Sequence, residues 1–391
     1  MKLAKFHISF IVAIVLLFTI TGFSQEIVPG ASRYEEYLSL LSKKKVGLVV
    51  NHTSMCGDEH LVDVLLSKGV LVKKIFAPEH GFRGESEAGE TVGHAVDLKT
   101  KLPIVSLYGD RKKPTPSDLA GLDILVFDIQ DVGCRFFTYI STMFYVMEAC
   151  AENNLPLIVL DRPNPNGDYV DGPVLKPEMK SFVGMVPIPV VHGCTLGELA
   201  LMFNGEGWLS KGKRCRLTII PVLNYTHSST YILPVKPSPN LPNHTAVRLY
   251  PSLCLFEATT VSVGRGTDFP FQVLGYPDPA FGNFSFVPVS IPGVCKNPIH
   301  ENKSCYGDDF RTLNQVPRFT LTYFIEYYSR FSNTELFWSD KRWIGLLTGD
   351  PNFYHQVTSR MSEVEIRKTW QPDLETYKDM REKYLLYSDF E

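Results

Sequence analysis

The feature of this sequence that most constrains its fold is an alternation of short apolar runs with helical patterns. Short apolar runs that end at turn residues are typical of buried strands, whereas apolar residues spaced three to four apart are typical of helices. Strands that alternate with helices form parallel sheets covered by helices. We therefore predict an α/β fold, with strands over residues 45–50, 71–77, 104–108, 124–129 and 157–160 and helices over 34–41, 60–68 and 138–153.

The pattern changes beyond about residue 215. Prolines become dense between residues 234 and 242, short β-like runs appear, and residues 373–387 have helical spacing with many charges. We predict a large α/β domain over residues 25–215 and a smaller α+β domain over residues 216–391.

The first residues of the chain have the pattern of a signal peptide. Lys2 and Lys5 precede an apolar run over residues 8–20, and Gly22 and Ser24 have the spacing of a cleavage site. We predict that residues 1–24 are removed and that the mature protein lies in the periplasm without a stable membrane anchor. Export beyond the periplasm and a retained N-terminal anchor are the alternatives.

Charge and cysteine usage exclude several classes of protein. The formal net charge is -3, so the chain has no bulk attraction to nucleic acid or anionic lipid. The eight cysteines include no C-x-x-C pair, which argues against a zinc ribbon. Most lie in apolar stretches and are expected to be buried. Cys295 and Cys305 flank a polar loop, where a disulfide and two free thiols are both compatible with the sequence.

Polar clusters follow four of the predicted strands directly. They are Asn51-His52-Thr53, Glu79-His80-Gly81, Asp128-Ile129-Gln130-Asp131 and Asp161-Arg162-Pro163-Asn164. Ligands of open α/β sheets bind at the carboxyl ends of the strands, where these clusters would meet. The sequence therefore predicts an active site at this edge of the sheet.

The segment Glu79-His80-Gly81-Phe82-Arg83-Gly84-Glu85 is the sharpest of these motifs. Hydrolysis of a glycoside requires a carboxylic acid that protonates the leaving oxygen and a second carboxylate. Glu79 follows an apolar strand, where partial burial could bring its acidity into the range of a general acid. A structural ion pair between Glu79 and Arg83 is the alternative.

Two further clusters carry side chains suited to a sugar. Asp128, Gln130 and Asp131 could hold hydroxyl groups or a water molecule, or could cap the next helix and pair with Arg135. Arg162 and Asn164 suit a carboxylate and an amide, or could belong to a well-ordered turn.

In the second domain, Glu257 precedes a Gly-Arg-Gly segment centred on Arg265. The segment lacks the spacing of a dinucleotide fingerprint. The chain also contains no P-loop, no H-E-x-x-H and no G-x-S-x-G motif, and the spacing of its histidines matches no metal site. We predict no metal and no cofactor. The residues alone thus indicate a secreted α/β hydrolase or a sugar-binding protein.

Long stretches of the chain resemble the DUF1343 family, which comprises exo-β-N-acetylmuramidases of glycoside hydrolase family 171. The matching stretches run from Gly47 to Arg311 and include GLVVNHTS, FAPEHGFRGE, DILVFDIQDVGCRFFTYISTM, LDRPNPNG, PIPVVHGCTLGELA, LYPSLCLFEATTVSVGRGTDFPFQ and SCYGDDFR. The resemblance implies a Rossmann-like parallel sheet domain followed by a smaller α+β domain, with the active site in the cleft between them.

The resemblance also implies a reaction and roles for residues. The expected reaction is release of N-acetylmuramic acid from the non-reducing end of peptidoglycan-derived oligosaccharides or disaccharides, without a metal. The family motifs suggest Glu79 as the general acid and Asp128 or Glu85 as the second carboxylate. Side chains that would contact the substrate are His80, Arg83, Gln130, Asp131, Arg162, Asn164, Glu257 and Arg265.

Two positions depart from the expected family pattern. Phe136-Phe137-Thr138-Tyr139 has less tyrosine than expected, and Ala258 stands where glycine is expected. Both could alter how the substrate fits. Two other functions are compatible with the sequence: a periplasmic receptor for muropeptides or sugars without turnover, and an amidase or esterase that acts on peptidoglycan. The missing nucleophile and zinc motifs argue against the latter.

Overall fold

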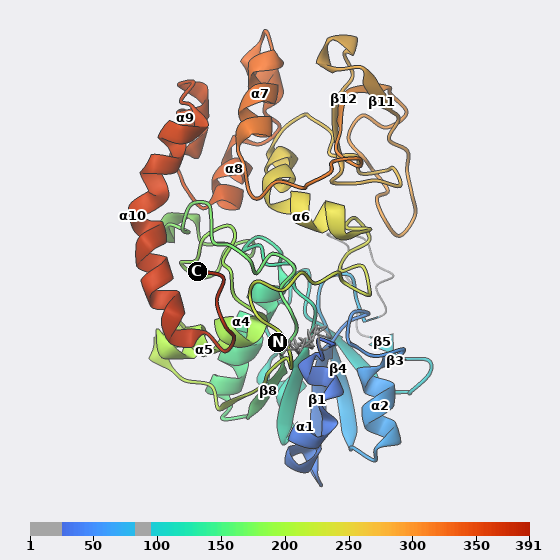
Figure 1. Ribbon diagram of the computed structural model, residues 1–391. Helices are drawn as coiled ribbons and strands as arrows, with labels where there is room; N and C mark the ends of the chain where they lie inside the picture. The colour runs from blue at the N-terminus through green and yellow to red at the C-terminus, as the bar shows by residue number, and fades with distance from the viewer. Residues whose placement is uncertain (1–25, 83–94) are drawn as a thin grey trace, which may run out of the picture.

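A computed structural model describes residues 26–82 and 95–391 of the protein (Figure 1). The predicted signal peptide over residues 1–24 lies outside the described residues. So do Arg83 and Glu85, two of the predicted site residues.

The core of the protein is a seven-stranded sheet with the order β5-β6-β4-β1-β7-β8-β9. All neighbouring strands are parallel except β5 and β6, which are antiparallel. Without β5, the strands lie in the order 3-2-1-4-5-6 along the chain, the order of Rossmann folds. The predicted parallel sheet is thus confirmed, and its strands are β1 (Val46–Val50), β4 (Val72–Ala77), β5 (Ala95–Val96), β6 (Pro103–Ser106), β7 (Ile124–Asp128), β8 (Leu157–Leu160) and β9 (Leu217–Ile220).

Helices cover both faces of this sheet because the side chains of the parallel strands alternate between two apolar clusters. Leu48 of β1 and Val126 of β7 pack with α1 (Tyr34–Leu41) and α2 (Leu61–Ser67) on one face. Val49 and Phe127 pack on the other face with α4 (Tyr139–Glu152) and α5 (Leu196–Gly205). We call this sheet with α1 to α5 the large-sheet unit; it also contains the short α3 (Pro116–Leu119) and the hairpin of β2 (Met55–Cys56) and β3 (Glu59–His60).

The boundaries predicted for the early elements are close to those observed. The helix predicted over residues 34–41 matches α1, and each predicted strand overlaps an observed strand. The edge strand β9 lies just after residue 215, so the large sheet contains residues from both sides of the predicted domain boundary.

A smaller unit lies above the large-sheet unit in Figure 1. Its sheet has the order β10-β12-β11 and is antiparallel throughout. This small-sheet unit confirms the predicted α+β part, and its elements are β10 (Val273–Tyr276), β11 (Phe284–Phe286), β12 (Cys305–Asp309), α6 (His244–Leu253), α7 (Thr322–Arg330), α8 (Lys341–Thr348) and α9 (Phe353–Thr358).

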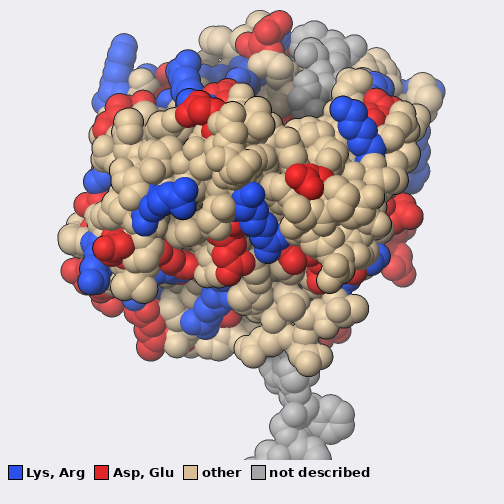
Figure 2. All heavy atoms as spheres, turned by 90° about the horizontal axis from the view of Figure 1, so that it is seen from above, with Lys and Arg blue, Asp and Glu red and all other residues tan. Residues whose placement is uncertain are grey.

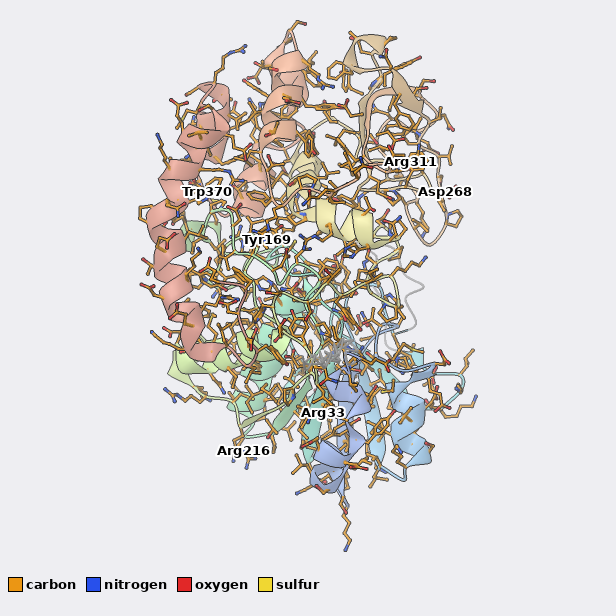
Figure 3. All side chains as sticks on the ribbon, in the orientation of Figure 1. Arg33, Tyr169, Arg216, Asp268, Arg311 and Trp370 are labelled. Carbon is orange, nitrogen blue, oxygen red and sulfur yellow. The ribbon has the colours of Figure 1, made fainter. Side chains whose placement is uncertain are left out.

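The long helix α10 (Glu363–Arg381) runs down one side of the molecule and contacts both units (Figure 1). Arg367 donates hydrogen bonds to the carboxylate of Asp171 at 2.8 Å and to the carbonyl of Phe319 at 2.7 Å. One turn further, Trp370, which is labelled in Figure 3, packs against Phe319. Tyr377 donates to the carbonyl of His192 at 2.7 Å. The helix therefore links the two units through both apolar and polar contacts.

No disulfide forms among the eight cysteines, all of which lie in the described residues, so Cys295 and Cys305 are not bridged. Across residues 26–82 and 95–391, no helix combines the length and the apolar character needed to cross a bilayer.

Candidate active site

A cavity of about 360 Å³ lies where the large-sheet and small-sheet units meet. The large-sheet unit contributes Glu79, Lys112 and Thr138 to its lining, and the small-sheet unit contributes Glu257 and Arg265. Its walls are rich in aromatic rings, including those of Tyr108, Phe137, Tyr139, Phe182, Tyr250 and Trp343. Aromatic walls with a few convergent charged groups are typical of sites that bind small molecules, and sugar faces pack well on such rings.

Glu79 reaches the cavity from a tight turn after β4. The turn is closed by a hydrogen bond from the backbone N–H of Gly81 to the carbonyl of Pro78 at 3.0 Å. His80 and Gly81 both have left-handed backbone angles, with φ of 68° and 72°. Thr138, the residue before α4, donates a hydrogen bond of 2.6 Å to one carboxylate oxygen of Glu79. Two strand-following segments therefore fix the position of this carboxylate.

Glu257 lies in the 3₁₀ helix Cys254–Ala258 and forms an ion pair with Arg265. The Nε of Arg265 donates to Glu257 at 2.9 Å, and the guanidinium lies 5.1 Å from the centre of the Phe271 ring. Burial alone would lower the pKa of Arg265, but the attraction of the Glu257 carboxylate raises that pKa above its ordinary value. The guanidinium is therefore positively charged at neutral pH.

The backbone around Arg265 depends on its two flanking glycines. Gly264 and Gly266 have φ of 79° and 81°. A Cβ atom on Gly264 would lie 2.6 Å from a methyl carbon of Val273, so a side chain does not fit at this position. The Gly-Arg-Gly segment thus places the side chain of Arg265 in the cavity wall.

The crevice between β1 and β7, where ligands bind in Rossmann folds, is closed by hydrogen bonds between the two following loops. The backbone N–H of Gln130 donates to the hydroxyl of Thr53 at 3.0 Å, and that hydroxyl donates to Asn51 at 2.6 Å. The hydroxyl of Ser54 donates to the carbonyl of Asp128. These bonds join the two loops across the switch point, and the cavity lies beside Glu79 instead.

Asp128 and Arg162 form a buried ion pair rather than part of the cavity wall. Asp128 is fully buried, and its two oxygens accept from the Nε and one terminal nitrogen of Arg162 at 2.6 and 2.9 Å. Burial would lower the pKa of Arg162, but its contact with Asp128 raises the pKa above the ordinary value. Arg162 also donates to the carbonyl of Met55 at 2.9 Å. The pair therefore joins the end of β7 and the segment after β8 to β2.

Gln130, Asp131 and Asn164 are also buried and engaged with the backbone. Gln130 donates to the carbonyls of Asp131 and Pro163, and Asp131 accepts from the backbone N–H of Gly133 at 2.6 Å. Asn164 donates to the carbonyl of Cys194 at 2.9 Å. Of the described residues predicted for the site, the cavity thus brings together Glu79, His80, Glu257 and Arg265 and does not include Asp128, Gln130, Asp131, Arg162 and Asn164.

Several cavity residues were not among the predicted site residues. Ser238 and Asn240 belong to a Pro-Ser-Pro-Asn segment within the proline-dense stretch between residues 234 and 242. Lys112 lies in an Arg-Lys-Lys run that looks like an ordinary solvated surface. Tyr250 and Trp343 come from helices of the small-sheet unit, and their spacing is that of core residues. The segment Phe136–Tyr139, where the chain departs from the expected pattern, also lines the cavity.

Within the described part of the chain, no group of three or more histidine, cysteine or carboxylate side chains is arranged to hold a metal ion. His52, for example, contacts the carbonyl of Lys236 at 2.9 Å.

Seen from above, basic and acidic side chains are interspersed over the visible face of the molecule (Figure 2).

Comparison with known proteins gives two adjacent family matches. Residues 46–245 match the N-terminal domain, and residues 248–387 the C-terminal domain, of the exo-β-N-acetylmuramidase NamZ. The chain is 45% identical over 252 residues to the peptidoglycan β-N-acetylmuramidase NamZ of Bacillus subtilis strain 168. This alignment covers 62% of the chain and 59% of the Bacillus protein.

Two solved structures have the same fold. Both are DUF1343 family proteins from Bacteroides fragilis NCTC 9343, with 45% and 29% sequence identity to this chain. Their TM-scores are 0.86 and 0.81, and each comparison covers 93% of this chain and 99% of the other.

Proposed function

Because the chain belongs to the NamZ family of exo-β-N-acetylmuramidases, we propose that it is an exo-acting glycosidase. Its substrates would be peptidoglycan fragments, from whose non-reducing end it releases N-acetylmuramic acid. The name of the 45% identical Bacillus relative supports this substrate class. The observation that carries the proposal is a cavity between two units that holds both Glu79 and Glu257.

These two carboxyl groups can supply the chemistry that glycoside hydrolysis needs. Glu79 accepts a hydrogen bond from the hydroxyl of Thr138, and Glu257 is paired with the guanidinium of Arg265. The two carboxyl groups thus line the cavity from different units. We assign Glu79 as the general acid that protonates the glycosidic oxygen while the bond to the anomeric carbon breaks. Glu257 would supply the negative charge that faces the developing oxocarbenium ion.

Asp128 suits this second role less well, although the sequence suggested it. Both of its oxygens are bound by Arg162, and the residue is fully buried away from the cavity lining. Glu85, the other suggestion, lies outside the described residues.

The location that fits this function is the periplasm, and we propose that residues 1–24 direct export there. The basic start and the apolar run over residues 8–20 support this assignment. Mass spectrometry of the protein recovered from a periplasmic extract tests it, since an uncleaved N-terminus would contradict it.

The function can be tested with a chromogenic β-N-acetylmuramide and the matching β-N-acetylglucosaminide. We expect the mature protein to release the chromophore from the muramide. Glu79→Gln should lower kcat by roughly 10²–10⁴-fold, the usual contribution of a general acid. Glu375→Gln, on the exposed side of α10, is the matched control and should be fully active.

The outcome separates an enzyme from a binding protein. If the folded wild-type protein releases nothing from either glycoside or from a disaccharide substrate, the hydrolase proposal fails. If wild-type activity is present and Glu79→Gln retains it, Glu79 is not the acid.

A further inference from the structure

Three consecutive basic residues follow the carboxyl end of β6, and only the middle one lines the cavity. Arg111 forms an ion pair with Asp118 at 3.5 Å. Lys113 lies 2.7 Å from Glu148 and 2.8 Å from Glu152 of α4. Lys112, between them, is half-buried and belongs to the cavity wall. Of the three, Lys112 is therefore the residue whose side chain belongs to the cavity wall, while the two outer cations pair with carboxylates of neighbouring elements.

The ammonium of Lys112 is held by an aromatic surface. Its Nζ lies 4.6 Å from the centre of the Phe182 ring, a distance typical of a cation–π contact. Phe182 is itself supported by Tyr145, with ring centres 6.3 Å apart and planes at 17°. An ammonium has three N–H donors. The face of an aromatic ring attracts its positive charge but cannot accept conventional hydrogen bonds from all three donors. No carboxylate among the described residues pairs with Lys112.

The other guanidinium or ammonium group of the cavity wall is already neutralised. Arg265 is bound to Glu257, so its charge is balanced within the protein. Within the described part of the wall, Lys112 is thus the one Lys or Arg that lacks a carboxylate partner. A ligand carboxylate in the cavity would complete its hydrogen bonding at a site that is partly removed from water, where such a contact is stronger than at the surface.

We propose that Lys112 binds the lactyl carboxylate of N-acetylmuramic acid and thereby selects muramyl over glucosaminyl substrates. This inference rests on the proposed function, because the lactyl carboxylate is the charged group that distinguishes these two sugars. Phe182 acts as a positioning residue, since its ring holds the ammonium at the wall of the cavity.

The test compares Lys112→Met with Lys113→Met, which removes a neighbouring lysine that faces α4 instead of the cavity. Kinetics are measured with the chromogenic muramide, with the same compound as its lactyl methyl ester, and with the glucosaminide. For the muramide we expect Lys112→Met to raise KM by about 10- to 100-fold, the usual effect of losing a charged hydrogen bond, with kcat changed little. The methyl ester should bind wild type and Lys112→Met equally well, because it carries no charge to recognise.

A binding measurement that does not depend on turnover gives a second readout. In titration calorimetry, free N-acetylmuramic acid should bind wild type and Lys113→Met with similar affinity and Lys112→Met about 10- to 100-fold more weakly. Equal KM and equal affinity in Lys112→Met and wild type would overturn the inference while leaving the hydrolase proposal intact. A wild-type protein that neither hydrolyses the muramide nor binds N-acetylmuramic acid would overturn both.

Discussion

At the scale of single residues, the charge of Asp128 serves the fold rather than the cavity. Its carboxylate is fully buried and bound on both oxygens by Arg162. Removing one partner of a buried pair leaves the other charge without compensation, which typically costs about 3–5 kcal/mol. The sequence could show a carboxylate at a strand end, but it could not show that a cation 34 residues later binds it.

We therefore predict that Arg162→Met lowers the free energy of unfolding by about 3–5 kcal/mol. Adding Asp128→Leu to this variant should restore part of the loss, because the double variant leaves no unpaired charge. Urea unfolding of the single and double variants measures both effects. The milder variant Asp128→Asn should keep kcat per folded molecule within about threefold of the wild-type value. A folded Asp128→Asn variant with a much lower kcat would show that Asp128 takes part in the reaction.

A second prediction concerns Asp161, which is fully buried beside the hydroxyls of Thr195 and Tyr387. Burial raises the pKa of this carboxyl from 3.8 to about 6, even though the hydrogen bonds from Thr195 and Tyr387 oppose the shift. The folded state thus favours the protonated form. The stability that the raised pKa of Asp161 contributes is fully present below pH 3.8 and is lost as the pH rises through about 6.

Relative to Asp161→Asn, the wild-type free energy of unfolding should therefore fall by about 2 kcal/mol between pH 4 and pH 7. Denaturant unfolding at several pH values measures this difference. Asp58→Asn, which changes an exposed carboxylate, serves as the control for replacing an aspartate by asparagine. A difference for Asp161→Asn that does not change with pH would mean that the pKa of Asp161 is not raised.

At the scale of elements, helix α8 depends on a glycine at its end. Gly349 has a φ of 72° and donates its backbone N–H to the carbonyl of Gly345 at 2.8 Å. A Cβ at this position would lie 2.6 Å from a terminal nitrogen of Arg135. Arg135 is buried and donates to the carbonyl of Leu347, so it has little room to move. The end of α8 is thus fixed by backbone angle and by packing together.

Gly349→Ala should lower the free energy of unfolding by about 1–3 kcal/mol. It should also raise KM for the muramide, because α8 carries Trp343 and Leu347 of the cavity wall. Gly57→Ala is the matched control, since Gly57 has a φ of 63° with no heavy atom within 4 Å of the added carbon. Thermal and urea unfolding compare the two; equal losses would show that crowding at Arg135 contributes nothing.

The sequence predicted the elements of the large sheet well because each strand carries apolar residues on both faces and ends at a polar turn. Val46–Val50 and Ile124–Asp128 are fully buried, which is why their runs are so apolar. The same apolar pattern cannot show which of the polar clusters after the strands line an open cavity. Three of the four clusters form hydrogen bonds among their own loops, and only the cluster at Glu79 and His80 faces the cavity.

At the scale of the whole molecule, the cavity exists because two units that are distant in sequence meet. Glu79 and Glu257 lie on different units, and no local pattern could place them beside each other. Their relative position depends on contacts far from the cavity. Tyr169, which lies between the units in Figure 3, stacks with Arg318 and accepts the backbone N–H of Phe319 at 3.2 Å.

Helix α10 bridges the same two units along one side. Near the start of the helix, Arg367 donates hydrogen bonds to Asp171 and to the carbonyl of Phe319. Near its end, Arg381 donates to the carbonyl of Gly193. A large change in the angle between the units would have to break these bonds. Under the proposed function, this bridge would limit how far the two carboxyl groups can move apart before a sugar binds. Less of the binding free energy would then go into reorganisation, and more would be available to distort the sugar ring toward its transition state.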